Sequence, residues 1–198
     1  LPGEDVSMID LPGVEILRGD IRDRDFVIAA CKGIDTVYHL AALISIMPTM
    51  KKQVRDVNIG GTENVIHACK AQRVGRLIYT SSIHAYGHPD PKLVIDESLP
   101  FDSNFDCNSY DQTKAEASRL VKEAAQAGLN AVILAPTGVI GPHDYKRSEM
   151  GGMTCYWMKN SPTVSMEGAY DFVDVRDVVE AHINAIERGE TGEAYILS

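Results

Sequence analysis

Short apolar runs alternate with longer amphipathic stretches along almost the whole chain. Five runs rich in Val, Ile and Tyr have the length of strands, and they lie at residues 14–20, 35–42, 76–82, 130–136 and 193–198. Four stretches between them have helical spacing, at residues 23–31, 51–72, 110–127 and 176–188. Alternation of strand and helix is typical of βαβ units, so the sequence predicts an α/β fold with a parallel sheet.

The predicted strands at 76–82 and 130–136 contain the continuous apolar runs LIYT and AVILA. Strands of a parallel sheet have this pattern because helices cover both faces of the sheet. We therefore expect a doubly wound sheet. In open sheets of this type, ligands bind beyond the carboxyl ends of the strands, so the residues that follow each run are the candidates for a site.

Residues 141–170 interrupt the alternation. They contain two prolines, a Gly-Gly pair, four Met and the only Trp of the chain. We interpret them as a small substrate-side lobe with one helix near residues 148–159. The predicted organisation is a main domain over residues 1–140, the lobe, and a return to the main domain over residues 171–198.

Composition narrows the class of protein. Of the 198 residues, 44% are hydrophobic and 24% are charged, which fits a globular chain with one sizeable core. The net charge of −9 argues against a nucleic-acid partner, which needs a basic surface, and favours a small-molecule partner. The four cysteines include no CxxC pair, so we expect neither a metal site nor a disulfide framework. No apolar run reaches the roughly 18 residues of a membrane span, and nothing resembles a signal peptide, which predicts a cytoplasmic protein with no membrane partner.

The stretch SYDQTK at residues 109–114 carries candidate chemistry. It opens a predicted helix, where Asn108 or Ser109 could be the N-cap and where Tyr110 and Lys114 lie one turn apart. A lysine ammonium close to a phenol favours the phenolate and lowers its pKa from about 10. A tyrosine tuned in this way can pass a proton to or from a substrate hydroxyl. The pair alone is a weak motif, because chance produces it often.

Hydroxyl side chains end the predicted strand at 76–82. Thr80, Ser81 and Ser82 lie where a parallel sheet binds its ligand, and they could hold a substrate oxygen. The alternative is a hydroxyl-rich turn that satisfies its own backbone. His84 follows closely, as a pocket residue that shuttles protons or as an exposed loop histidine.

Seven blocks of the chain, in order and spacing, resemble the extended short-chain dehydrogenase/reductases, a family that includes nucleotide-sugar epimerases and dehydratases. The blocks are GDIRD (19–23), DTVYHLAA (35–42), DVNIGGTENVIHAC (56–69), YTSSIHAYG (79–87), SYDQTKAEAS (109–118), APTGVIGP (135–142) and DFVDVRDVVEA (171–181). The resemblance implies an NAD(P)-binding Rossmann fold. It also implies a homodimer that associates through the helices at 51–72 and 110–127.

The resemblance assigns catalytic roles position by position. It implies that Tyr110 is the catalytic acid-base, and that Lys114 lowers the pKa of Tyr110 and binds the nicotinamide ribose. It implies that Ser82 holds the substrate oxygen, with Ser81 as the alternative. Asn58 matches a structural position behind the site.

The resemblance also implies NAD or NADP as cofactor, with one set of residues beside the adenine ring, a second near the ribose and phosphates, and a third near the nicotinamide. In that order along the chain, the cofactor positions are Asp20, Ile21, Leu40, Ala41, Ala42, Thr80, Tyr110, Lys114, Pro136 and Val139.

One part of the family pattern is absent from these 198 residues. No GxxGxxG occurs, although this fingerprint brings backbone amides and a helix N-terminus to the pyrophosphate. The matched region begins after the family's first βαβ segment, so the sequence alone predicts poor dinucleotide binding. Two explanations stay open: the segment lies in residues outside this sequence, or the protein lacks it. The first is favoured, because a sheet without its central strand exposes an apolar edge that invites aggregation.

Two further departures concern the substrate. Nucleotide-sugar members carry Arg where this chain has Tyr170, and 4,6-dehydratases carry an Asp-Glu pair where it has Ile83 and His84. Both favour a fairly apolar, non-nucleotide substrate and members resembling hydroxysteroid dehydrogenases and dihydroflavonol reductases. We therefore expect hydride transfer between nicotinamide and a secondary alcohol or ketone. A nucleotide-sugar epimerase or dehydratase is the first alternative, and a non-catalytic, cofactor-sensing or scaffold protein is the second. Asp174 and Asp177 are expected to cap the helix that follows them, with no metal bound.

Overall fold

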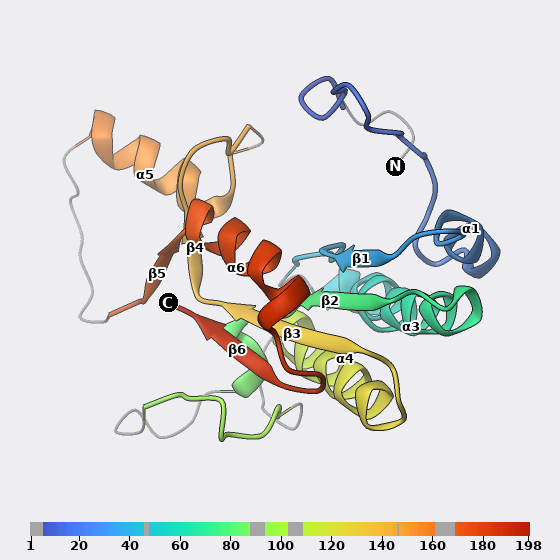
Figure 1. Cartoon of the computed structure of the whole chain (residues 1–198). Helices are drawn as coiled ribbons and strands as arrows, with labels where there is room; N and C mark the ends of the chain where they lie inside the picture. The colour runs from blue at the N-terminus through green and yellow to red at the C-terminus, as the bar shows by residue number, and fades with distance from the viewer. Residues whose placement is uncertain (1–5, 46–47, 88–93, 103–108, 146, 161–168) are drawn as a thin grey trace.

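A four-stranded parallel sheet forms the centre of the protein (Figure 1). The computed structural model describes residues 6–45, 48–87, 94–102, 109–145, 147–160 and 169–198. In spatial order the strands are β1 (Thr36–His39), β2 (Arg76–Thr80), β3 (Ala131–Pro136) and β6 (Ala194–Leu197). Each neighbouring pair is parallel. Four of the five predicted strands are confirmed, and so is the parallel α/β class.

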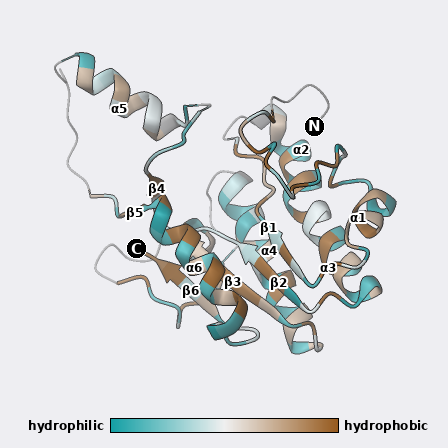
Figure 2. Cartoon of the chain, turned by 45° about the horizontal axis from the view of Figure 1, so that its top comes forward, coloured by the Kyte–Doolittle hydropathy of each residue, from teal (hydrophilic) through white to brown (hydrophobic). Residues whose placement is uncertain are grey.

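Helices cover both faces of this sheet. The principal helices are α1 (Arg24–Ala30), α3 (Gly61–Gln72), α4 (Ser109–Gln126) and α6 (Val175–Arg188). Leu77 and Tyr79 of β2 point to the face packed by α1, α3 and α4, whereas Ile78 points to the opposite face and packs with Ala185 of α6. Because alternate side chains of the same strand are buried on opposite faces, the strand has the continuous apolar run that the sequence shows. The doubly wound arrangement is confirmed, and Figure 2 shows most of β3 and β6 as hydrophobic.

The predicted helix at 51–72 is present but not uniform. It begins after the 3₁₀ turn η1 (Pro48–Met50) as α2 (Lys51–Arg55), passes through the π-helical turn η2 (Asp56–Gly60), and continues as α3. A π-turn inserts an extra residue into a helix and frequently marks a functional position. Here it buries Asn58.

Asp174 is the N-cap of α6, as predicted, and its carboxylate accepts a hydrogen bond from the Arg176 amide at 2.8 Å. The prediction that Asp177 is also a cap is wrong: it lies inside the first turn of the same helix, where a negative charge is favourable. Of the two predicted caps of α4, Asn108 lies outside the described residues, and Ser109 is the first residue of the helix.

The predicted strand at 14–20 is wrong. These residues form no strand, and Val14 and Leu17 are about half exposed. A strand is defined by hydrogen bonds to a neighbour, and β1, the nearest edge of the sheet, pairs only with β2 within the described part of the chain. The alternating sequence is therefore compatible with a strand but does not make one.

A small sheet that the sequence did not predict flanks the region predicted as a substrate-side lobe. Strand β4 (Gly138–Ile140) precedes it, strand β5 (Phe172–Asp174) follows it, and the two are parallel. The predicted helix near 148–159 is confirmed as α5 (Glu149–Lys159), which stands apart from the main sheet in Figure 1. Residues 161–168 lie outside the described part, and the predicted domain division stays a prediction.

Candidate active site

Strand β2 brings two serines to its carboxyl end, and their side chains make different contacts. Ser81 is buried, and its Oγ lies 2.6 Å from the Oγ of Ser118 on α4. Ser82 is the N-cap of the 3₁₀ turn η3, and its Oγ accepts a hydrogen bond from the His84 amide at 3.3 Å. The side chain of Ser82 also hydrogen-bonds Tyr110. Ser82 therefore shares a site with Tyr110, whereas Ser81 contacts the packed face of α4.

Lys114 is buried one turn beyond Tyr110 on α4. Its Nζ donates a hydrogen bond to the backbone carbonyl of Thr80 at 2.7 Å. The same ammonium lies 5.1 Å from the centre of the Tyr79 ring, within the range of a cation–π contact. The last two residues of β2 therefore hold the lysine at the strand end.

The pKa values of the pair differ in direction from the sequence-based expectation. Burial raises the pKa of Tyr110 to about 12, although its hydrogen bond with Ser82 acts in the opposite direction, and the negative charge of Asp111 raises the pKa further. Burial also lowers the pKa of Lys114 to about 8. Burial is the largest effect on both groups and places the Tyr110 pKa above its ordinary value, and the lowering of that pKa by Lys114 stays a prediction.

A second set of polar side chains lies beside Tyr110. The Nε2 of His84 lies 2.8 Å from the hydroxyl of Tyr170, and its Nδ1 lies 3.7 Å from a carboxylate oxygen of Asp111. Asp111 is buried, and His84 and Tyr170 are partly exposed. The position of Tyr170 depends on Gly138, because a Cβ there would lie 2.6 Å from the Tyr170 ring. The sequence predicted His84 at the pocket but missed Asp111, whose only signal is its place directly after Tyr110.

Asn58 connects the segment after β1 to α4. Its Oδ1 accepts from the Leu43 amide at 2.7 Å, and its Nδ2 donates to the Leu43 carbonyl at 3.1 Å and to Thr113 Oγ1 at 2.9 Å. Thr113 Oγ1 in turn donates to the Tyr110 carbonyl at 2.8 Å. Asn58 therefore has a structural place behind the site.

Replacing Asn58 by alanine is expected to lower the free energy of unfolding by about 3 kcal/mol, because it removes three hydrogen bonds and leaves buried partners unsatisfied. The matched control is Asn64→Ala, on the same helical segment, whose half-buried amide donates only to two backbone carbonyls. We expect the control to cost about 1 kcal/mol or less. Urea unfolding followed by circular dichroism measures both free energies of unfolding. Equal losses in the two variants contradict the expectation that the hydrogen bonds of Asn58 stabilise the fold more than those of Asn64.

The other predicted cofactor residues lie at the carboxyl ends of successive strands. Leu40, Ala41 and Ala42 follow β1 and are exposed. Thr80 ends β2 and is partly buried, and Pro136 ends β3 and is buried. Val139 lies in β4 and is 39% exposed. The parallel topology thus brings the residues that follow or end β1, β2 and β3 to one end of the main sheet, where Lys114 also lies, whereas Val139 lies in β4 of the small sheet, three residues beyond the end of β3.

Asp20 and Ile21 precede α1. The carboxylate of Asp20 is held by the guanidinium of Arg22 at 2.6 Å, and these hydrogen bonds lower the pKa of Asp20 to about 2. Ile21 packs against Gly61, where a Cβ would lie 2.8 Å from the Ile21 side chain. The close contact places Ile21 against the first turn of α3.

A cavity of about 300 Å³ lies beside β1. Its lining includes the predicted cofactor residues Ile21, Leu40 and Ala41 together with Gly19 and Tyr38. The apolar walls and the glycine suit the adenosine end of a dinucleotide, so the residues present fit that part of the cofactor.

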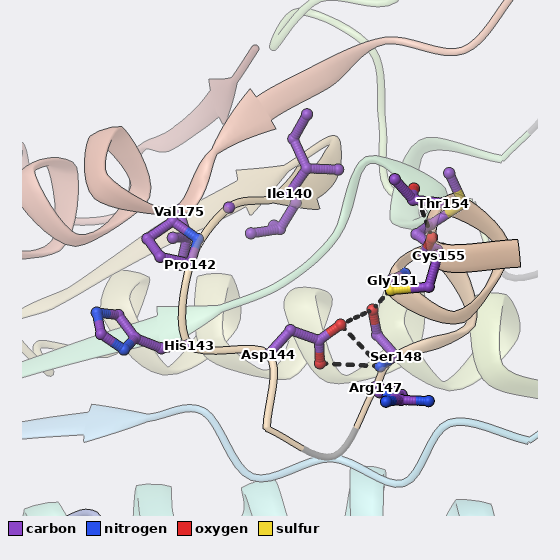
Figure 3. A pocket seen from close by; sticks show the side chains of 13 residues that line it. Ile140, Pro142, His143, Asp144, Arg147, Ser148, Gly151, Thr154, Cys155 and Val175 are labelled. Carbon is purple, nitrogen blue, oxygen red and sulfur yellow. Dashed lines mark hydrogen bonds between the residues drawn. The ribbon is translucent and has the colours of Figure 1, made fainter. Parts of the chain in front are cut away.

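A larger cavity of about 720 Å³ lies on the lobe side (Figure 3). Its lining includes Val139 and Ile140 of β4 but neither Tyr110 nor Lys114. One wall is the start of α5, where the Asp144 carboxylate accepts hydrogen bonds from the amide and the hydroxyl of Ser148. Val139, one of the predicted nicotinamide contacts, therefore lies in the wall of this cavity.

No helix in the described ranges is long and apolar enough to cross a membrane. Within the same ranges, no three His, Cys, Asp or Glu side chains come together in a way that could hold a metal ion.

Comparison with known proteins agrees with the parallel α/β fold. The model of the NAD dependent epimerase/dehydratase family matches residues 3–198, and the chain belongs to this family. It is 32% identical over 197 residues to sterol demethylase protein B of Methylococcus capsulatus, an alignment that covers 98% of this chain and 59% of that protein.

Solved structures give the same result. The crystal structure of gox2253 has a TM-score of 0.90 and 30% identity, and the match covers 99% of this chain and 60% of that one. The UDP-glucose 4-epimerase of Thermus thermophilus, solved with NAD, has a TM-score of 0.79 and 27% identity, over 95% of this chain and 64% of that one. The chain thus spans about three-fifths of the length of these proteins.

Proposed function

We propose that the full-length protein is an NAD(P)-dependent oxidoreductase that transfers a hydride between nicotinamide and a secondary alcohol or ketone. The observation that carries this proposal is the meeting of Ser82, Tyr110 and Lys114 at the carboxyl end of β2. This set of groups is suited to one task, which is to bind a substrate oxygen and move its proton.

The protein residues divide the chemistry among them. The hydroxyls of Ser82 and Tyr110 hold the substrate oxygen, and Tyr110 takes its proton during oxidation or returns it during reduction. Lys114, held by the Thr80 carbonyl, supplies positive charge beside the phenol once substrate and cofactor exclude water. When bound, the nicotinamide supplies the hydride acceptor or donor.

The cofactor is NAD or NADP in this proposal. Ile21, Leu40 and Ala41 form the adenosine end of its site, with Asp20 and Ala42 beside them, and Thr80, Pro136 and Val139 border the nicotinamide end together with Tyr110 and Lys114. The similarity to an epimerase solved with NAD supports this choice.

The substrate in this proposal is a fairly apolar, non-nucleotide molecule. The surface of the large cavity that Val139 lines is mainly apolar, with Ile140, Pro142 and Val175 among its walls, and polar side chains such as Asp144 and Arg147 also line it. His84 and Tyr170 border the substrate side of Tyr110, and Ser81, which is bonded to Ser118, takes no part. Similarity to a sterol demethylase protein supports an apolar substrate.

The second candidate is a nucleotide-sugar epimerase or dehydratase. It is favoured by the family's description and by the 27% identity to a UDP-glucose 4-epimerase. In such a reaction the hydride returns to the substrate, and no net reduction of nicotinamide accumulates. A non-catalytic, cofactor-sensing or scaffold role is the third candidate, and it has no need for the Ser82, Tyr110 and Lys114 set.

The absorbance of reduced nicotinamide separates these candidates. With a panel of hydroxysteroids and other secondary alcohols and NAD or NADP, we expect the absorbance of the full-length protein's reaction to rise in step with alcohol consumed. Conversion of UDP-glucose without net absorbance change supports the epimerase instead. Cofactor binding without turnover of either class supports the non-catalytic role.

The homodimer and the cytoplasmic location stay predictions. In the proposed dimer, the helices at 51–72 and 110–127 associate across the two copies. Within one chain these helices are linked by an ion pair between Arg55 and Glu116, whose closest atoms are 3.1 Å apart. Light scattering of the purified full-length protein measures its mass directly.

A further inference from the structure

Thr80, the last residue of β2, makes hydrogen bonds on both faces of the sheet. Its backbone carbonyl accepts from the Nζ of Lys114 on α4 at 2.7 Å. Its Oγ1 lies 2.7 Å from the Nε2 of His182 on α6. Because α4 and α6 pack on opposite faces, Thr80 joins the candidate catalytic lysine to a histidine on the other side of the sheet.

The imidazole of His182 is fixed at both nitrogens. Its Nδ1 lies 2.7 Å from the carbonyl of Val178, one turn earlier on α6. A carbonyl only accepts hydrogen bonds, so Nδ1 carries the proton, and in the neutral ring Nε2 accepts the proton of the Thr80 hydroxyl. The ring is buried and stacks in a tilted arrangement on Tyr38 of β1, with 6.2 Å between ring centres.

The position of His182 is set by the packing of α6 itself. Ala185, one turn further along the helix, is buried against Ile78, Val132 and Leu134 of the sheet. A helix packed in this way has little freedom to move, so the imidazole offers Thr80 a fixed acceptor. The hydrogen bond to His182 holds the Thr80 side chain, and with it the Thr80 backbone, at the end of the strand. The backbone in turn sets the direction in which the Thr80 carbonyl points.

We propose that His182 is a positioning residue for Lys114, acting through Thr80. His182 holds the Thr80 side chain, and the Thr80 carbonyl then holds the lysine ammonium beside Tyr110. The catalytic consequence rests on the function proposed above, whereas the effect on Lys114 itself does not. The titratable groups that face Lys114 are Tyr110 on its own helix, Tyr79 on β2 and His39 on β1.

The direct test is the titration of Lys114 in the full-length protein. Lysine labelled with ¹³C at Cε reports protonation by NMR, and the Lys114 signal is the one absent from Lys114→Met. A carbonyl acceptor favours the ammonium form, so loosening it lowers the titration midpoint. In His182→Leu and Thr80→Val, we expect that midpoint to fall by about half a pH unit or more relative to the wild type.

Two variants control for general loosening of the structure. Thr80→Ser keeps the hydroxyl and is expected to titrate like the wild type. Ile78→Val removes one buried methylene from the same strand and the same face, with no hydrogen bond involved. If His182→Leu and Thr80→Val leave the Lys114 midpoint where it is in Ile78→Val, the proposal is wrong.

The kinetic arm uses the same variants. We expect kcat to fall about tenfold in His182→Leu and Thr80→Val, with the KM of the alcohol changed less, because the lysine acts on the proton transfer. Retention of the wild-type kcat in Ile78→Val supports positioning, and equal losses in Ile78→Val contradict it. If the wild type turns over no substrate, the proposed function fails while the NMR titration still decides the role of His182.

Discussion

Replacing Tyr110 by phenylalanine is expected to lower kcat by about 10²- to 10⁴-fold, the range over which a positioned acid-base contributes. The change removes one oxygen from a half-buried side chain on α4 and leaves the helix intact. Ser82 can still hydrogen-bond the substrate oxygen, but no group remains to move its proton. Steady-state kinetics with a secondary alcohol measure the loss, and nicotinamide binding, measured by fluorescence, is expected to persist.

The matched control for this experiment is Tyr86→Phe. Tyr86 is buried in η3, and its hydroxyl has no hydrogen-bond partner in the described part of the structure. Removing that hydroxyl leaves no broken bond, so activity and stability are expected to stay at wild-type levels. A Tyr110→Phe protein that keeps kcat within a few fold of the wild type contradicts the acid-base assignment.

The main sheet was predictable because its strands are buried on both faces. AVILA is apolar at every position and LIYT at all but its last residue, and β2 and β3 lie where those runs predict them. The segment at 14–20 has apolar side chains at Val14, Ile16 and Leu17 but no partner strand among the described residues, and pairing is not encoded in one segment alone. Strands β4 and β5 have three residues each, too few for a period to be detected.

The candidate site was predictable where residues are neighbours in sequence. Tyr110 and Lys114 lie one helical turn apart, and that spacing alone puts them on one face. The direction of the Tyr110 pKa was not predictable, because burial depends on the packed fold. The contact between Thr80 and His182 joins residues 102 positions apart, and no pattern in either segment indicates it.

Replacing Lys114 by methionine is expected to separate stability from activity. The buried ammonium has a pKa of about 8, against an ordinary value of 10.5 for an unfolded chain, so folding disfavours its charged form. At pH values between these two pKa values the unfolded state binds more protons than the folded state. The free energy of unfolding of the wild type therefore increases as the pH rises through this range. At about 1.4 kcal/mol for each tenfold change in proton affinity, the gain is about 3 kcal/mol.

Methionine has no ionisable group, so the stability of Lys114→Met lacks this gain. The free energy of unfolding of Lys114→Met minus that of the wild type should therefore be about 3 kcal/mol higher at about pH 7 than at about pH 11. The hydrogen bond to Thr80 is stronger for the ammonium than for the neutral amine, and this difference is already contained in the folded pKa of about 8, so it adds no separate contribution to the comparison. Urea unfolding at the two pH values measures this difference. The control is Lys122→Met, which replaces an exposed lysine on the same helix and should keep the pH dependence of the wild-type stability. We expect kcat of Lys114→Met to fall about 10²-fold or more. If the stability difference between wild type and Lys114→Met is independent of pH, folding does not disfavour the charged form of Lys114, and the lowered pKa of this group is contradicted.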